Sequence, residues 1–137
     1  MSDKSHNKRE ISENTAIPQL SLSLFKDTSN GYNLYLSLVN YQIQPPELSQ
    51  IKGVLNVPLE GHAHLYINGI KIGRLYGVYY HLPEKMFNAG VNNIKVTLNS
   101  HDHAVWIVQD KEVLSSLMIN TLKEDFILYQ FDTQAVK

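Results

Sequence analysis

Five of the six histidines in this chain lie between positions 62 and 103, and four of them form two pairs with the same spacing. His62 and His64 occur in "EGHAHLYING", and His101 and His103 occur in "NSHDHAVW". In a β-strand, residues i and i+2 project from the same face about 6–7 Å apart, because each residue advances the strand by ~3.3 Å. Two imidazoles at that spacing can reach one ion, so each pair is a candidate for metal binding.

The available donor types indicate which metal would bind. The chain has no cysteine, so the donors are neutral imidazoles with a neighbouring carboxylate, Asp102. Imidazole-rich sites suit copper and zinc, and the affinity of divalent ions rises toward copper. We therefore predict a copper site, with zinc as the alternative, built from His62, His64, His81, His101 and His103. Asp102 is expected to orient one imidazole by accepting its second N–H. The competing interpretation is a metal-free cluster of hydrogen-bonded or solvent-facing histidines.

Hydrolytic chemistry has less support. Ser100, His101 and Asp102 are neighbours in sequence, whereas a catalytic triad is assembled in space from separate segments. The chain has no G-x-S-x-G elbow and no glycine-rich loop of the kind that binds phosphate. We therefore do not expect a hydrolase, and these observations favour a non-enzymatic role without deciding between an enzyme and a non-enzyme.

Aromatic and basic residues in the same segment offer a second surface. The aromatic residues of this segment are a candidate platform for stacking on a sugar or on a partner protein. They are Tyr66, Tyr76, Tyr79, Tyr80 and Trp106. Tyrosine is also common on half-exposed strands, which is the simpler explanation. Arg74 is either an ordinary exposed cation or the partner of a carboxylate such as Glu60 or Asp102.

Alternating apolar and polar residues predict the strands that must position these groups. "QLSLSLFKD" and "YNLYLSLVNY" alternate with a period of two around an Asn30-Gly31 turn, which predicts a hairpin. "HAHLYI" places its histidines on one face and its aliphatic residues on the other, and Asn68-Gly69 predicts a turn into "IKIGRLY". The long connection "QPPELSQIKGVLNVPLEG" has room for a short strand or a helical turn. "VLSSLMINTL" fits either a strand or a helix, and further strands are predicted at "VYYHL", "NNIKVTLNS", "AVWIV" and "DFILYQF".

This pattern predicts about seven to nine short strands separated by turns. The predicted fold is an antiparallel β-sandwich of the immunoglobulin-like or cupredoxin-like kind, with a small up-and-down β-barrel as the alternative. Residues 1–16 are polar and aperiodic, which predicts a flexible N-terminal arm. Residues 17–137 are expected to form a single β-sandwich domain.

Composition excludes several classes of protein. An apolar fraction of 43% with 18% charged residues is typical of a soluble globular domain. A net charge of −1 argues against binding to nucleic acid or to an anionic membrane surface. The apolar runs are shorter than the ~20 residues of a membrane span, so none is expected. The first ten residues lack a secretory signal, which predicts a cytoplasmic protein as the chain stands, and a periplasmic or exported one if a leader has been removed.

The segments "EGHAHLYINGIKIGRLYG", "YYHLP" and "NNIKVTLNSHDH" resemble a group of small, largely uncharacterised bacterial β-proteins, usually exported. These carry a GHAHLY-x-NG strand followed by a VTLN-x-x-DH strand, and the resemblance covers residues 60–103. "GYNLYLSLVNYQIQPPE" is similar to the hairpin that precedes this core in the group. The resemblance implies a periplasmic metal role, with copper as the metal. It places ligands at His62, His64, His81 and His103, whereas members of the group vary at the position of His101.

A looser resemblance concerns ligand spacing alone. Copper-zinc superoxide dismutases also set a His-x-His on a strand of an immunoglobulin-like barrel and add later histidines. This chain differs in having no cysteine pair and no recognisable zinc subsite. The resemblance therefore implies similar ligand geometry and not kinship.

Three hypotheses follow from these observations. The first is a periplasmic copper carrier or buffer, with a metal ion and a partner metalloprotein as its partners. In it His62, His64 and His103 bind the ion, and His81 or His101 completes the shell. The second is a metal-free interaction or assembly module that binds through exposed tyrosines and strand edges. The third is a copper redox enzyme of the superoxide dismutase type.

Overall fold

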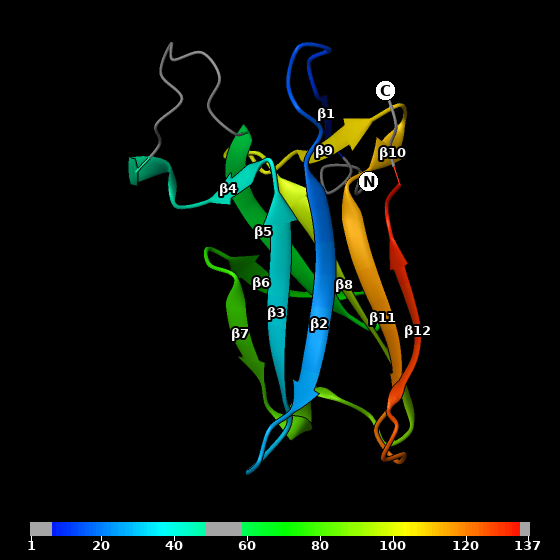
Figure 1. The fold of residues 1–137 in the computed structure, drawn as a ribbon. Coiled ribbons are helices and arrows are strands. Elements are labelled where there is room, and N and C mark those ends of the chain that lie inside the picture. The colour runs from blue at the N-terminus through cyan, green and yellow to red at the C-terminus, as the bar shows by residue number, and fades with distance from the viewer. Residues whose placement is uncertain (1–6, 49–58, 135–137) are drawn as a thin grey trace.

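The computed structural model describes residues 7–48 and 59–134. Over these residues the chain forms two β-sheets and no α-helix (Figure 1). The sheets pack as a sandwich and do not close into a barrel, so the predicted β-sandwich is confirmed and the barrel alternative is wrong. No helix in the described part of the chain is long and apolar enough to cross a membrane.

The smaller sheet of the described residues contains β2 (Gln19–Lys26), β3 (Tyr32–Val39) and β7 (Tyr79–Leu82), in the order β2-β3-β7. The β2–β3 hairpin confirms the prediction from the alternating leucines, and its strands are antiparallel along their whole length. Gly31 lies in the turn with φ +73°, a left-handed conformation that glycine adopts without steric cost.

The larger sheet is built around β8, which pairs with β5 on one side and with β11 on the other. Its nine strands in the described residues are β1 (Lys8–Glu10), β4 (Tyr41–Ile43), β5 (Leu59–Ile67), β6 (Ile70–Leu75), β8 (Val91–Asn99), β9 (Val105–Val108), β10 (Lys111–Glu112), β11 (Leu114–Asn120) and β12 (Ile127–Asp132). The β5–β6 hairpin turns at Asn68-Gly69 as predicted, with φ +53° and +82°. Two pairings are parallel, β1 with β9 and β4 with β5, so the sheet is not purely antiparallel.

Two stretches that sequence patterns left open are settled by the structure. "VLSSLMINTL" contains a strand, β11, which lies between β8 and β12. The long connection that starts at Gln44 contains a 3₁₀ turn, η2 (Pro46–Leu48), and its last residues begin β5, whereas the short strand β4 lies just before it. A second 3₁₀ turn, η3 (Glu84–Met86), follows β7. Residues 49–58 of the connection lie outside the described residues.

Part of the stretch predicted as a flexible arm, residues 1–16, lies in the larger sheet and its core. Lys8–Glu10 form β1, which pairs with β9 from Lys8↔Val105 to Glu10↔Ile107. The Ile11 side chain, 5% exposed, joins the core. The three residues of β1 are polar and exposed, so backbone pairing forms this strand without an apolar pattern to reveal it. Residues 1–6, with His6, lie outside the described residues.

The hydrophobic core lies between the inner faces of the two sheets. Leu22 and Leu34 from the smaller sheet join Leu65, Val96 and Leu117 from the larger one. Successive side chains of a strand alternate between faces, so Leu65 and its i±2 neighbours on β5 point into this core. The intervening residues of β5, which include both histidines, therefore project from the outer face of the larger sheet.

Candidate metal centre

Strand β5 supplies two histidines that stand side by side on the outer face of the larger sheet. His62 and His64 are 1% and 4% exposed, because neighbouring side chains and the β8–β9 connection cover them. Their Nε2 atoms are 2.9 Å apart. On the adjacent strand, Asn99 pairs with His62 and Thr97 pairs with His64. The spacing that suggested a pair of ligands in the sequence is thus realised as a close approach of two imidazole nitrogens.

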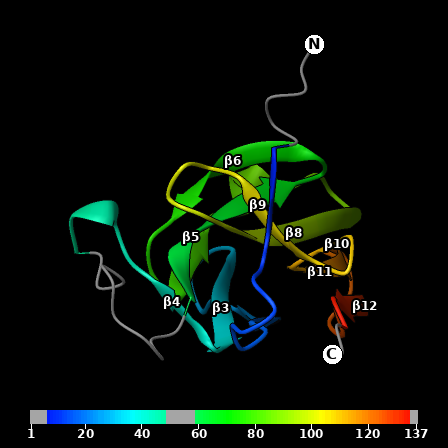
Figure 2. The ribbon, with the colours of Figure 1, turned by 90° about the horizontal axis from the view of Figure 1, so that it is seen from above.

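The third histidine reaches the same place from the connection between β8 and β9. A tight turn forms there, in which the Ser100 N–H donates to Ala104 O and the His103 N–H donates to Ser100 O, both at 2.8 Å. His103 has φ +70°, and its carbonyl accepts a 3.3 Å hydrogen bond from Asn99 Nδ2. In the view down the sandwich this connection passes over the β5 region (Figure 2). It brings His103 Nδ1 to 3.2 Å from His62 Nε2.

The geometry of the cluster of His62, His64 and His103 suits a single metal ion. One nitrogen from each ring lies within 4.8 Å of the others. Metal–nitrogen bonds of ~2.0–2.1 Å place two ligand nitrogens roughly 2.9–3.4 Å apart for bond angles between 90° and tetrahedral. The separations of His62 Nε2 from His64 Nε2 and from His103 Nδ1, 2.9 and 3.2 Å, fall in that range, whereas the ligand atoms of His64 and His103 lie within 4.8 Å of each other and would move closer on binding. The cluster can therefore hold a metal ion through three imidazoles, which leaves a fourth tetrahedral position for another ligand.

The protonation state of the cluster favours metal binding. Burial, together with positive groups nearby, lowers the pKa of His62 to about 4 and that of His64 to about 3. Burial also lowers the pKa of His103, with Arg74 and Lys71 contributing. All three rings are therefore neutral at neutral pH. A neutral imidazole has one nitrogen without a proton, and that nitrogen can bind a metal without first losing one.

Two predicted ligands lie elsewhere. His101 turns toward Glu60, whose Oε1 atom is 3.4 Å from His101 Nε2. His81 lies on β7 in the other sheet, where its Nδ1 atom is 2.8 Å from Asn33 Oδ1. β7 pairs with β3 and not with β5 or β6, so the structure does not bring His81 to the cluster. The predicted set of five histidines is thereby reduced to three.

Asp102 does not take the predicted role of orienting an imidazole. Its carboxylate accepts a hydrogen bond from Ser100 Oγ and lies 3.7 Å from Arg9 Nη1. His62 Nδ1 is buried without a hydrogen-bond partner in the described part of the chain. The His62 ring is positioned by the contacts of its Nε2 atom with His64 and His103 and by packing, with the Tyr76 ring centroid 5.4 Å away and that of His103 4.9 Å away.

Glu60 is a buried carboxylate beside the cluster that the sequence analysis did not identify as a site residue. Glu60 is 2% exposed, and its Oε2 atom accepts a 2.5 Å hydrogen bond from Gln44 Nε2. Its other oxygen faces His101, which belongs to the turn that carries His103. Glu60 precedes His62 by two residues, so the same period of two that placed His62 and His64 on one face could have placed Glu60 there. Glu60 thus links β5 to the His103 turn.

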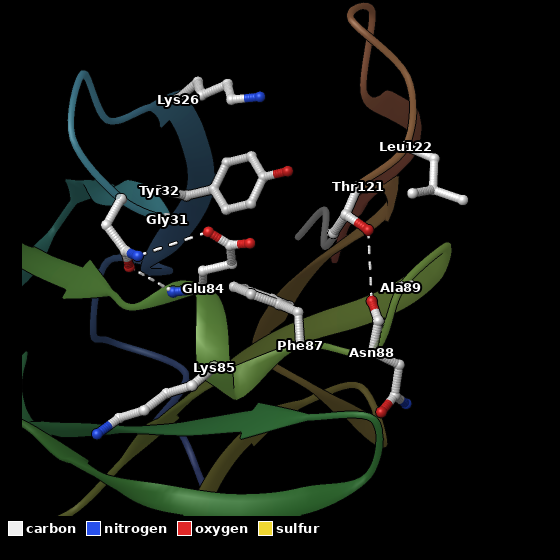
Figure 3. Close-up of a pocket in the computed structure, with 11 residues that line it drawn as sticks. Lys26, Gly31, Tyr32, Glu84, Lys85, Phe87, Asn88, Ala89, Thr121 and Leu122 are labelled. Atoms are coloured by element: carbon white, nitrogen blue, oxygen red, sulfur yellow. Dashed lines mark hydrogen bonds between the residues drawn. The ribbon is translucent and has the colours of Figure 1, made fainter.

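A pocket of about 600 Å³ lies at the end of the sandwich away from β9 (Figure 1). Tyr32 lines it on one side and Thr121 on the other, while Lys85 extends away from the cavity (Figure 3). The Asn30 and Glu84 side chains in its wall are hydrogen-bonded to each other. No histidine of the described residues lines this pocket, so it is separate from the cluster of His62, His64 and His103.

The metal-free protein is expected to lose stability as the pH falls from about 6.5 to about 4. In this window the unfolded chain protonates His62 and His64 near their ordinary pKa of 6.5, whereas the folded protein holds both rings neutral until about pH 4 and 3. The unfolded state therefore binds more protons, and the free energy of unfolding decreases. Urea unfolding at a series of pH values measures this decrease, which should be shallower in His64→Gln. An equally steep decrease in His64→Gln would contradict the assignment, and His81→Gln serves as the control.

The sequence matches no protein-family model and no curated protein, and the fold matches no solved structure. The resemblance of residues 60–103 to exported bacterial β-proteins stays a prediction. Function is therefore inferred from the positions and the chemistry of the cluster.

Proposed function

We propose that this protein binds one copper ion through His62, His64 and His103 and serves as a copper carrier or buffer. The observation that carries the proposal is the convergence of three neutral imidazole nitrogens from two separate segments of the chain. Three imidazoles without a thiolate suit Cu(II) and Zn(II), and copper is bound more tightly in the divalent series. Zinc is the alternative ion.

The different exposure of the three histidines supports a carrier, which must release its ion, more than a closed storage site. His62 and His64 are buried in the sheet, whereas His103 is exposed on the β8–β9 turn. An exposed third ligand can be displaced by a ligand of another protein, which gives the ion a route in and out. A partner metalloprotein in the periplasm would be the recipient, which is the location that the resemblance implies.

Titration of the metal-free protein tests the proposal. We expect one tight equivalent of Cu(II) in competition with a chelator of known affinity, and weaker binding of Zn(II). Binding to the folded state alone should raise the free energy of unfolding by about 2.7 kcal/mol when free metal is 100 times the dissociation constant. Absence of stoichiometric binding by either ion would overturn the proposal.

A copper redox enzyme is the second candidate, because a three-histidine set leaves a coordination position open to a substrate. The copper-loaded protein distinguishes the two functions. Turnover of superoxide by that form would favour the enzyme, and its absence would leave the carrier as the function.

A further inference from the structure

Two basic side chains stand beside the cluster on the outer face of the larger sheet. Arg74 on β6 is the cross-strand partner of His64, and Lys71 is the partner of Tyr66, two residues further along β5. Residues directly opposite each other in an antiparallel pair project from the same face, with Cβ atoms about 4.5–5.5 Å apart. Both side chains are exposed, so they face solvent beside the histidines.

A tyrosine holds Arg74 near the buried rings. Arg74 Nη1 donates a 3.2 Å hydrogen bond to the Tyr76 hydroxyl, and the Tyr76 ring packs against His62. Arg74 and Lys71 both lower the pKa of each histidine in the cluster, which places their positive charge within electrostatic reach of all three rings. Arg74 is thus exposed, as one of the two predictions has it, and in the described residues it bonds to Tyr76 and forms no ion pair with Glu60 or Asp102.

The carboxylates near the cluster are engaged with other groups. Glu60 contacts Gln44 and His101, and Asp102 contacts Ser100 and lies near Arg9. A divalent ion bound by three neutral imidazoles would add two positive charges next to two existing cations. Such a concentration of positive charge, partly removed from water, is unfavourable unless an anion accompanies the ion.

We propose that the metal ion takes a small monoanion from solution as its fourth ligand, and that Arg74 and Lys71 bind the negative charge of this anion. The inference rests on the proposed metal site. The anion donates a lone pair to the open coordination position and approaches from solvent, on the side where His103, Arg74 and Lys71 are exposed. Halide, azide and carboxylate groups belong to this class.

Azide titration of the copper-loaded protein tests the inference. One equivalent of Cu(II) is bound first, in a weakly coordinating buffer at constant ionic strength. Azide is then added while the azide-to-copper charge-transfer absorbance and the electron paramagnetic resonance spectrum are followed. Azide affinity should fall on the order of tenfold in Arg74→Gln and again in the double variant with Lys71→Gln. Copper affinity, measured separately without azide, should stay the same or increase because a repelling charge has been removed.

Lys26→Gln is the control, because it removes an exposed lysine from β2 of the smaller sheet, which pairs with neither β5 nor β6. Its azide affinity should equal that of the parent protein. If copper binds but azide leaves both spectra unchanged, or binds equally well to Arg74→Gln, the anion inference is overturned while the metal site stands. If azide binds equally well without copper, the anion is held by side chains alone and is not a metal ligand. If copper itself does not bind, the proposed function and this inference both fail.

Discussion

His103→Asn is expected to bind copper on the order of 100-fold more weakly than the parent protein, or weaker still, with an unchanged fold. Loss of a group that merely supports a metal ligand costs about 10–100-fold in affinity, and loss of a ligand itself should cost at least as much. The fold should persist because His103 is exposed and has φ +70°, a backbone conformation that asparagine tolerates well. Competition titration measures the affinity, and circular dichroism verifies the fold.

Two further variants separate ligation from backbone effects. His103→Gly also suits the left-handed conformation and should show the same loss of affinity, with the turn intact. His81→Gln removes a histidine of the other sheet and should bind copper as tightly as the parent protein. Parental affinity in His103→Asn would remove His103 from the site, and a large loss in His81→Gln would mean that the effects are not specific to the cluster.

Gly61→Ala is expected to lower the free energy of unfolding by about 3 kcal/mol or more. Gly61 lies on β5 between Glu60 and His62, and a Cβ atom there would clash with the Asn99 carbonyl oxygen and lie 2.5 Å from the Tyr41 hydroxyl. Neither group can move freely. The Tyr41 hydroxyl donates to Asn99 O at 2.9 Å and accepts a 3.2 Å hydrogen bond from Trp106 Nε1. Accommodation of the methyl group would push β5 and β8 apart beside the cluster.

Urea unfolding measures this loss, and Gly73→Ala provides the control. A Cβ atom at Gly73 on β6 would meet nothing within 4 Å, so this variant should unfold at nearly the parental urea concentration. Copper affinity should also fall in Gly61→Ala, because His62 is the next residue on the displaced strand. Equal stability of the two alanine variants would show that the packing around Gly61 is not tight.

The alternating pattern of the sequence was sufficient to place two of the three histidines of the candidate site. It placed His62 and His64 on one face of a strand, opposite to Leu65, and the structure confirms this arrangement. The same kind of pattern predicted both hairpins and the sandwich. These features depend on the two-residue repeat of a strand and on the conformational freedom of Asn-Gly turns, which are local properties.

The remaining contacts depended on which strands pair. His81 lies in the smaller sheet because β7 pairs with β3. The polar residues of β1 form a strand because they pair with β9. His101 and His103 share the His-x-His spacing, yet they point to different partners. The positive φ of His103 breaks the extended conformation that such a spacing assumes.

The sequence by itself thus determined which side chains share a face within one strand, since strand geometry repeats every two residues. The first hypothesis named His103 as a ligand beside His62 and His64, but only the tertiary structure brought these three together without His81 and His101. It also decided that His101 contacts Glu60 and that Arg74 and Lys71 flank the cluster. These contacts join segments far apart in the chain, and they are set by sheet order, register and one tight turn. A periodic pattern within a single strand carries no information about such partners.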